Sequence, residues 1–424
     1  MKQVLASSWA LLLGMMLLMV GNGLQGTLLG IRGGDADFST FQMSVVMSAY
    51  FVGFLGGSRL APDMIRRVGH VRVFAALGSL ISAVLILYPV LVDPISWTVG
   101  RVIIGFCFSG VYVTAESWLN NSADNENRGQ ALSAYMLVQM TGIVVAQGLL
   151  LIPDPSGFLL FILPSILVSL AFAPILLSIS PTPAFDATKP MTLKELFDTS
   201  PLGCVGMFLL GGVFSAQFGM AAVFANLAGL SLGQISIFIS TIYIGALVLQ
   251  YPIGWISDRM DRRTLILAVC VIGGIGAMIG FLLMNFFPAL LLAAFIIGGM
   301  SNPLYALLIA YTNDFLQHED MAAASGGLIF INGIGAIAGP LITGWMMGVI
   351  GPRGFFLFVG VLLFALAAYA LYRMTQRAVS TEVEETTSYA PIFPSASPVA
   401  VEVAQEYYIE TALEDEAEDA DTRL

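Results

Sequence analysis

Residues 254–263, with the sequence GWISDRMDRR, combine a glycine, two acids and three arginines between two long apolar stretches. The Asp258 carboxylate could form ion pairs with Arg259, Arg262 or Arg263, or cap the N-terminus of a neighbouring helix. Gly254 would let another helix approach closely. We expect this cluster to act as a latch, which holds helix ends together in one conformation and releases them in another. The alternative is that the arginines only set the orientation of the chain in a membrane.

Two more charged side chains lie within apolar stretches, where an ionised group is costly unless it has a partner or faces water. Glu116 could form a gating ion pair with Arg67 or Arg128, serve as a proton-coupling site, or lie at the level of the lipid headgroups. Arg101 could face a cavity and contact substrate or respond to a coupling proton, or it could extend to the membrane surface. Their separation of about 22 Å along a helix excludes a direct pair.

Uncharged polar side chains within the apolar stretches are candidates for lining a substrate pathway, because amides buried in a membrane need hydrogen-bond partners. They are Asn22, Gln25, Gln139, Gln147, Gln217, Gln250, Asn302, Tyr305 and Asn332. Such side chains favour a small neutral or polar organic solute. The three cysteines and two histidines have no metal-ligand spacing, and no phosphate-binding loop motif occurs. We therefore expect no metal, no cofactor, no nucleic-acid partner and no enzymatic activity.

The elements that must position these residues are transmembrane helices. Of 424 residues, 57% are hydrophobic and 11% charged, against roughly 25% charged residues in soluble domains. About twelve apolar runs approach the ~20 residues that cross a bilayer, and most lack the alternation of a barrel strand. They cover 7–31, 42–62, 72–92, 95–119, 130–152, 157–179, 202–230, 234–256, 264–284, 286–312, 322–349 and 354–374. We predict an all-α integral membrane protein with twelve transmembrane helices.

A polar break at residues 180–201 divides these runs into two sets of six. It predicts a six-helix bundle over residues 1–179, a cytoplasmic linker over 180–201, and a second six-helix bundle over 202–374. Residues 375–424 hold 12 of the 28 acidic residues and are predicted to form a disordered acidic tail. Its role could be solubilising, or it could bind a partner or regulate the protein.

The two halves of the chain echo each other at an offset near 192. Gln25 corresponds to Gln217 at an offset of 192, and Tyr112 corresponds to Tyr305 at 193. A parallel repeat of six helices predicts two bundles related by an axis along the membrane normal, with the substrate path between them near the midplane.

Basic residues indicate the orientation of the chain. If the N-terminus is cytoplasmic, 13 basic residues fall on the cytoplasmic side and two, Arg32 and Arg353, on the other. This asymmetry predicts that both termini of the multi-pass chain are cytoplasmic, because cytoplasmic loops carry the excess of lysine and arginine.

The stretch at 254–263 resembles the signature loop of the major facilitator superfamily, whose pattern is roughly G-x-x-x-D-R-x-G-R-R. Asp261 replaces the second glycine. A degraded copy at residues 62–72 keeps Arg67 and Gly69 but has Arg66 at the acidic position. Asp63 could pair with Arg67 one turn later. The latch is therefore expected to be asymmetric.

Two more stretches add to this resemblance. RVIIG, from Arg101 to Gly105, is similar to the R-x-x-x-G of the superfamily's fourth helix, and VTAESWLNNS followed by NRGQALSAYM resembles bacterial YcaD-type members. The resemblance implies secondary transport of a small molecule across the bacterial inner membrane by two rocking bundles, with proton coupling as a family expectation.

Two alternatives stay open. Gly339-Pro340 is similar to the motif of drug–proton antiporters, although that motif belongs in the fifth span, where this chain has Gly148-Leu149. Close packing around a kink would also explain these glycines. The other alternative is a non-transporting receptor or scaffold that acts through its acidic tail.

Overall fold

The computed structural model describes residues 2–122, 128–152, 157–177, 191–376 and 389–392, together with 397, 400, 401 and 404. Within this part of the chain, ten helices are long and apolar enough to cross a membrane. Two shorter apolar helices, Ser133–Leu149 and Leu159–Pro174, lie where the fifth and sixth spans were expected. The prediction of an all-α membrane protein is confirmed.

The helices of the first half follow the predicted runs closely. They are α1 (Lys2–Asp35), α2 (Thr40–Val68), α3 (His70–Leu87), α4 (Pro94–Ser122), α5 (Arg128–Leu149) and α6 (Leu159–Leu177). In the second half, a short helix, α7 (Leu193–Thr199), precedes the spans. The remaining helices are α8 (Pro201–Ser215), α9 (Ala221–Leu227), α10 (Leu232–Ser257), α11 (Arg262–Leu282), α12 (Phe287–Asn313), α13 (His318–Ile350) and α14 (Gly354–Gln376).

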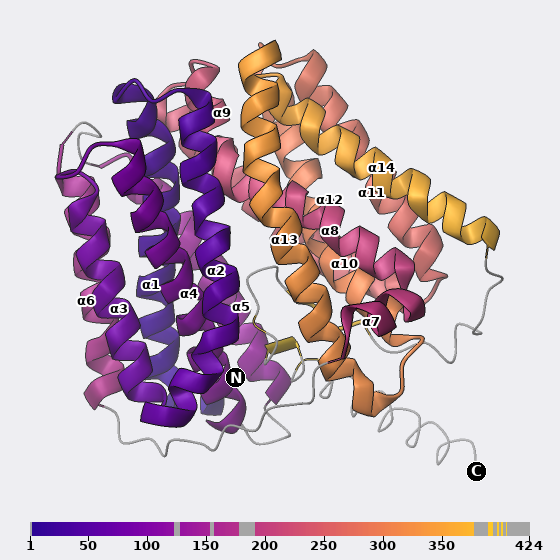
Figure 1. Ribbon diagram of the computed structural model, residues 1–424, viewed down its shortest axis with the longest axis horizontal. Coiled ribbons are helices and arrows are strands. Elements are labelled where there is room, and N and C mark those ends of the chain that lie inside the picture. Colours follow the sequence, from indigo (N-terminus) through magenta and orange to yellow (C-terminus); the bar gives the residue numbers. More distant parts are fainter. Residues whose placement is uncertain are drawn as a thin grey trace.

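Figure 1 shows the first six helices grouped on one side and the helices after residue 200 on the other. Among the described residues, helices of the two groups pack on each other where α2 meets α13, α1 meets α9, and α5 meets α10. We call the end of the helices that carries the turns at Gly69 and at residues 258–261 the basic end. At the other end the groups are in direct contact, since Asn226 Nδ2 donates to the Ile31 carbonyl at 3.3 Å and Ser236 Oγ to the Gln147 carbonyl at 2.7 Å.

Equivalent glycines hold corresponding helix pairs together in the two halves. A Cβ on Gly53 of α2 would lie 1.9 Å from the Val102 carbonyl oxygen of α4. At an offset of 192, a Cβ on Gly245 of α10 would lie 2.3 Å from the Phe295 carbonyl oxygen of α12. Bare glycines are therefore needed for the helix backbones to touch, which is how membrane helices gain packing energy without a hydrophobic effect between them. The sequence repeat extends to the packing of the two halves.

The seventh span is not one regular helix. A π-helical turn, Ala216–Met220, joins α8 to α9 and carries Gln217. Such turns insert one residue into the helical ladder and often occur at functional positions. The apolar pattern of this span predicted a continuous helix. A π-helical turn leaves that pattern apolar, so hydrophobicity alone does not reveal it.

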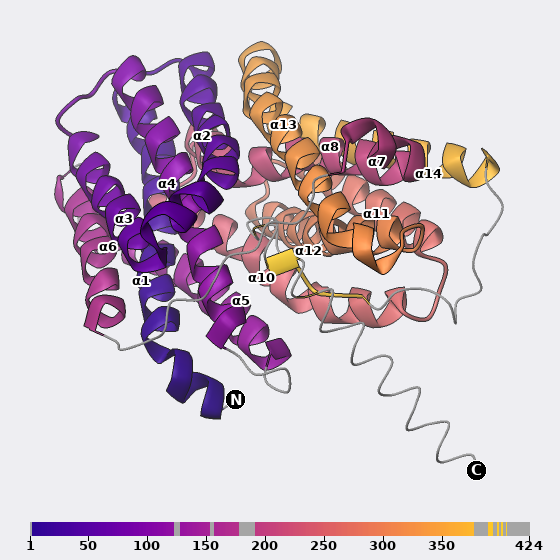
Figure 2. The ribbon, with the colours of Figure 1, turned by 60° about the horizontal axis from the view of Figure 1, so that its bottom comes forward.

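Several described residues of the predicted acidic tail are packed among the helices. Helix α14 ends at Gln376, two residues beyond the predicted end of the last span. Tyr389, Ala390, Ile392, Ser397, Ala400, Val401 and Ala404 are buried. Figure 2 shows these pieces (yellow) near α5 and α10, at the basic end. Their few apolar side chains find a place among the helices that the composition of the tail does not reveal, and disorder of the rest of the tail stays a prediction.

Gly105→Ala tests the glycine contacts. Its Cβ would lie 1.9 Å from the Tyr50 carbonyl oxygen of α2, so two rigid backbones must separate. We expect a loss of about 1–3 kcal/mol in the free energy of unfolding, as in other overpacked sites, measured by thermal unfolding in detergent. Gly148→Ala, where a Cβ meets nothing within 4 Å, is the control. Equal stability of both variants would contradict this account of α2–α4 packing.

Candidate functional site

A central cavity lies between the two groups of helices, about halfway along them. It contains about 1350 Å³ of space between its lining atoms, including the part open to solvent. Seven of the predicted pathway residues line it: Asn22, Gln25, Arg101, Gln147, Gln217, Asn302 and Asn332. Gln139, Gln250 and Tyr305 are also buried but are not among its lining residues. The structure therefore brings most of the predicted residues from both halves of the chain into one site.

Arg101 is the one charged residue among the lining residues of this cavity that the structure describes. It lies about 10 Å along α4 from the helix start, and its side chain is 3% exposed. Its Nη1 donates to Gln25 Oε1 at 3.0 Å, and the guanidinium carbon lies 4.6 Å from the centre of the Tyr50 ring. Its Nε has no hydrogen-bond partner. Arg101 therefore faces the cavity instead of extending to a membrane surface.

A chain of hydrogen bonds continues from Arg101 within the first bundle. Gln25 Nε2 donates to Asn22 Oδ1 at 3.2 Å, and Asn22 Nδ2 donates to the Tyr112 hydroxyl at 3.2 Å. This chain holds the Gln25 carbonyl towards the guanidinium, since its amide nitrogen is already used by Asn22. These hydrogen bonds in series hold the Arg101 side chain in its orientation.

The second bundle contributes amides without a charge. Gln217 Nε2 donates to Ser301 Oγ at 2.9 Å, and Asn332 Nδ2 donates to the Met207 carbonyl at 2.9 Å. Asn302 Nδ2 bonds the Gly298 carbonyl of its own helix at 3.2 Å, whereas its buried Oδ1 has no partner. At the offset of 193, Arg101 corresponds to Ala294. The repeat thus places the cavity charge in one half only.

Sequence reasoning missed the aromatic lining. Tyr50, Phe51, Phe54, Tyr112, Phe214, Phe218 and Tyr243 line the cavity, and Phe218 stacks on Tyr243 with ring centres 5.5 Å apart. Aromatic residues are common throughout these apolar spans, so composition gives no signal for them. The position of Tyr50 beside Arg101 follows from the contact of α2 with α4 at Gly105, which only the packing reveals.

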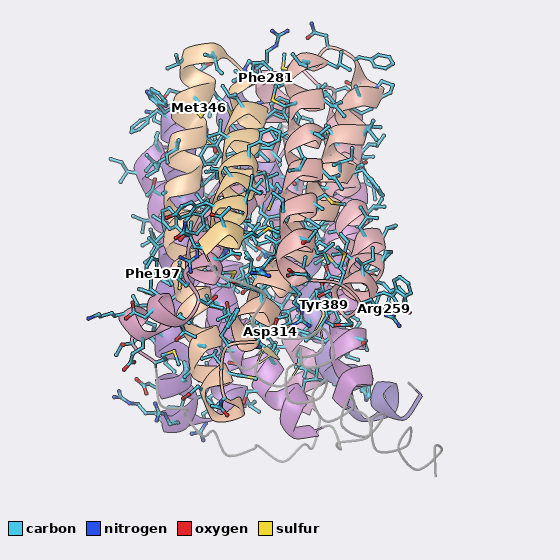
Figure 3. All side chains as sticks on the ribbon, turned by 90° about the vertical axis from the view of Figure 1, so that its right-hand side faces the viewer. Phe197, Arg259, Phe281, Asp314, Met346 and Tyr389 are labelled. Carbon is cyan, nitrogen blue, oxygen red and sulfur yellow. The ribbon has the colours of Figure 1, made fainter. Side chains whose placement is uncertain are left out.

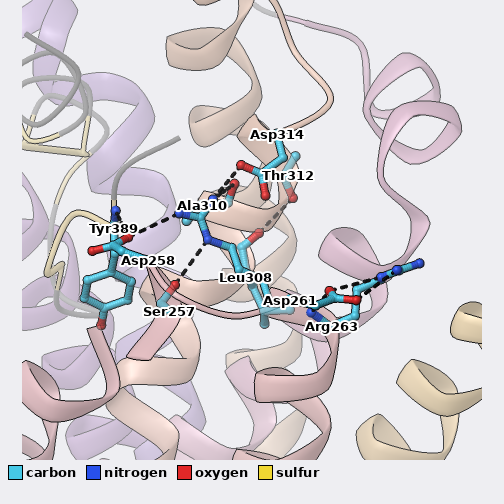
Figure 4. Close-up of polar contacts among 10 residues, drawn as sticks. Ser257, Asp258, Asp261, Arg263, Leu308, Ala310, Thr312, Asp314 and Tyr389 are labelled. Atoms are coloured by element: carbon cyan, nitrogen blue, oxygen red, sulfur yellow. Dashed lines mark hydrogen bonds and ion pairs between the residues drawn. The ribbon is translucent and has the colours of Figure 1, made fainter. Parts of the chain in front are cut away.

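The predicted latch is centred on Arg262 at the start of α11, with a side chain that is 2% exposed. Its Nη1 pairs with Asp314, its Nε donates to Ser257 Oγ at 3.1 Å, and its Nη2 lies 3.5 Å from Asp258 Oδ1 (Figure 4). The predicted Asp258–Arg262 pair is present, but Asp314, which sequence reasoning missed, makes the closer contact. Asp314 caps the end of α12, so this cluster ties α10, α11 and α12 together within one bundle.

The other residues of the predicted latch have separate roles. Asp261 caps α11 by accepting from the Arg263 backbone at 2.9 Å, and its carboxylate pairs with the Arg263 guanidinium at 2.9 Å. Arg259 packs over the Trp255 ring at 4.2 Å and is exposed. Gly254 lies against the Tyr389 ring, where a Cβ would approach Cδ1 to 2.6 Å.

The first-half copy of the loop is built differently. Gly69 ends α2 with φ +86, a conformation that glycine adopts at no steric cost. Asp63 pairs with Arg66 and not with Arg67 as predicted, because the exposed side chains meet at i,i+3. Arg67 is exposed. His70, predicted in a loop, begins α3 and is buried, with its Nε2 at 3.0 Å from Ser117 Oγ.

Glu116 is 2% exposed near the basic end of α4. Its Oε1 accepts from the Tyr135 hydroxyl at 2.9 Å and its Oε2 from the Ser397 backbone N–H at 2.8 Å. Among described side chains, its hydrogen bonds do not include Arg67, and the Arg128 side chain lies outside the described residues. The described partners of Glu116 are two neutral donors, one of them from the tail, and the predicted gating pair with Arg128 stays a prediction.

Comparison with known proteins identifies the family. The model of the family described as Major Facilitator Superfamily matches residues 11–239 and 203–405. The chain belongs to the major facilitator superfamily. It is therefore a membrane transporter, and its overlapping family matches agree with the repeated packing of the two halves.

Named relatives and solved structures agree with this assignment. The chain is 27% identical over 341 residues to the uncharacterized MFS-type transporter YcaD of Salmonella arizonae, covering 80% of this chain and 88% of the relative. The YcaD protein of Escherichia coli O6:K15:H31 is 28% identical over 342 residues with the same coverage.

Two solved structures share the fold. A mutant of the nucleoside transporter NupG has a TM-score of 0.73 at 15% identity, covering 86% of this chain and 99% of that one. A bacterial homologue of the human lysosomal transporter Spinster, described as inward-facing and unoccupied, has a TM-score of 0.66 at 15% identity, covering 96% and 98%.

Asp314→Asn tests the centre of the latch. Of its two described carboxylate partners, the buried Arg262 guanidinium would keep the more distant one, Asp258. Breaking a buried ion pair by removing one partner costs up to about 3–5 kcal/mol. We expect a clear fall in the thermal midpoint of the solubilised protein. Asp63→Asn is the control, because its exposed pair contributes about 0–1 kcal/mol. A similar effect in both variants would show that the Arg262 cluster does not stabilise the second bundle.

Proposed function

We propose that this transporter moves a small organic anion through the central cavity by alternating access. The cavity lies between two bundles that each contribute polar side chains, as expected for a substrate site that either side of the membrane reaches in turn. The charge asymmetry of the loops supports assigning the basic end to the cytoplasm and both termini to that side of a bacterial inner membrane.

The observation that carries the substrate class is the buried charge of Arg101. Its neighbours are an amide oxygen and aromatic rings, and none of the described residues that line the cavity carries a carboxylate. A buried ionised group without a counter-charge is unfavourable, so an anionic ligand would bind with a large gain. The free Nε and its neighbouring N–H groups suit a carboxylate, which can accept two hydrogen bonds at once. This replaces the neutral solute that the amides alone suggested.

The rest of the lining describes the body of the anion. The aromatic side chains of both bundles offer apolar and stacking surfaces, and the unpaired Asn302 Oδ1 offers an acceptor to a hydroxyl or amino group. The space of about 1350 Å³, part of it open, is sufficient for a metabolite-sized solute. A small carboxylate with an apolar body and a hydrogen-bond donor fits these features best.

Proton coupling is the second part of the proposal. An anion that enters the cell works against an interior-negative potential at about 2.3 kcal/mol per charge and 100 mV, and a co-transported proton cancels that term. Glu116 is the candidate carrier, since it is buried and receives hydrogen bonds from Tyr135 and the Ser397 backbone without a cationic partner among the described contacts.

Arg101→Gln tests the anion site. We expect small carboxylates, and not the corresponding primary amides, to raise the thermal midpoint of the wild-type protein. Loss of the charged hydrogen bonds should weaken carboxylate binding by about 1.5–3 kcal/mol, or roughly 10- to 100-fold in Kd. The carboxylate that binds is then tested for uptake into proteoliposomes.

Arg353→Gln, the same change at an exposed arginine, is the matched control. Stabilisation by amides as strong as that by carboxylates would overturn the anion class. Uptake of a neutral solute through the cavity would overturn it too, while leaving the transporter assignment intact. Unchanged carboxylate binding by Arg101→Gln would place the anion elsewhere.

Glu116→Gln tests the coupling. Wild-type proteoliposomes should take up the anion faster when a pH gradient is imposed. The variant keeps the size of the side chain and one acceptor oxygen but cannot exchange a proton, so it should keep solute exchange and lose the gradient dependence. Wild-type uptake that ignores the pH gradient, or a variant that still follows it, would rule out Glu116 as the coupling residue.

A further inference from the structure

The C-terminal tail contributes buried residues to the basic end of the molecule, next to the proposed pathway. Tyr389 is 5% exposed and Val401 is fully buried. In Figure 3, Tyr389 lies at about the same height as Asp314 and Arg259, towards the end of the helices opposite Phe281 and Met346. The tail therefore has a defined binding site among the membrane helices, and we call this site its seat.

On the second bundle, the seat is formed by one face of α10. Gln250 Nε2 donates to the Tyr389 hydroxyl at 3.0 Å, and Asp258 Oδ1 accepts from the Tyr389 backbone N–H at 2.8 Å. The ring crosses the surface of Gly254, which has no side chain to displace it. Gln250, Gly254 and Asp258 are spaced at i, i+4 and i+8, so they lie along one stripe of the helix. The stripe thus binds both the side-chain hydroxyl and the backbone N–H of Tyr389.

On the first bundle, the seat is Glu116 of α4. The Ser397 backbone N–H donates to Glu116 Oε2 at 2.8 Å in a buried contact. Tyr135 satisfies only the other carboxylate oxygen. The tail therefore contacts α10 through Tyr389 and α4 through Ser397, and these helices belong to different bundles. A single short segment bridges the two bodies that alternating access must move.

We propose that the described tail residues, 389–392 with Ser397, Ala400, Val401 and Ala404, form an intramolecular plug, which occupies the cytoplasmic mouth between the bundles and inhibits transport. The inference rests on the proposed function, since a plug matters only if the bundles rock. At the opposite end α1 already touches α9, so the alternative conformation must bring the basic ends together. A peptide between α4 and α10 prevents that approach and covers the route to the central cavity.

The tether makes such a plug effective without a strong contact. A segment joined to α14 has an effective concentration that a free peptide would need millimolar amounts to match. The contacts are also reversible, because they consist of a few hydrogen bonds and one aromatic ring. Withdrawal of the segment would leave Glu116 and Asp258 each without one donor, and both would face the opened mouth. The plug and the proposed coupling residue are therefore directly linked.

Access to the central cavity provides a test that does not depend on transport. Ile329, which lines the cavity, is replaced by cysteine, and the native Cys107, Cys204 and Cys270 are buried and free. Labelling by a membrane-impermeant maleimide is followed from the tail side in the full-length protein. The combination of Tyr389→Ala with Ser397→Pro, which removes the backbone donor to Glu116, should label faster. A plug seated in nine molecules of ten would give about a tenfold increase.

Tyr372→Ala, at a tyrosine of α14 that is 56% exposed, is the matched control and should label like the parent. A second experiment introduces a protease site between residues 379 and 386, so that the protein folds with its tail and is cut afterwards. After removal of the fragment, labelling should rise, and a synthetic peptide of residues 386–405 should slow it again.

Two results would overturn the plug. One is parent protein that labels as fast as the double variant, and the other is cut protein whose labelling the peptide does not slow. Neither result bears on the anion or on proton coupling, because the labelling needs no solute and no gradient. With the carboxylate identified, the double variant should also show faster uptake, and slower uptake would contradict inhibition.

Discussion

A guanidinium group held in a cavity whose described lining contains no acidic residue is the feature on which the site depends. Arg101 is buried beneath Tyr50 and bonded to Gln25, and an ion in such surroundings has few ways to lower its free energy. The helix contact that positions it is a direct touch of α2 and α4 backbones at Gly53 and Gly105. The close contact of two helix backbones therefore determines where the charge of Arg101 lies. The arginine stays available to an anion because the groups around it are aromatic rings and amides.

The repeated architecture carries unequal chemistry in its two halves. The glycine contacts of α2 with α4 recur in α10 with α12, yet the alanine at 294 stands where the first half has Arg101. At the basic end, the buried ion pair among the described residues lies in the second half instead of the first. The second half has the buried Arg262–Asp314 pair, whereas the first half has a glycine turn and an exposed Asp63–Arg66 pair. Two bundles with the same packing can thus rock as similar bodies while one provides the cavity charge and the other the rigid ion-pair cluster.

The proposed plug would connect the ion-pair cluster of the second bundle to α4 of the first bundle. It joins the latch residue Asp258 to Glu116, which are distant in sequence and lie on different bundles. Both carboxylates receive backbone N–H groups of the tail, so the contact depends on chain path more than on side-chain identity. The acidic composition of residues 375–424 gives no sign of such binding, because the contacting residues are a tyrosine, a serine and small apolar side chains within it.

The sequence alone determined the membrane helices, because an apolar run of sufficient length must satisfy its backbone hydrogen bonds within one helix. It also determined most of the polar cavity residues, because amides and an arginine are rare and costly in such runs. Partners were decided only by the tertiary structure. Asp314 reaches Arg262 from another helix, Tyr50 covers Arg101 across a glycine contact, and the Ser397 backbone N–H donates to Glu116. These contacts join residues 52, 51 and 281 positions apart, and no local pattern encodes which distant helix faces come together.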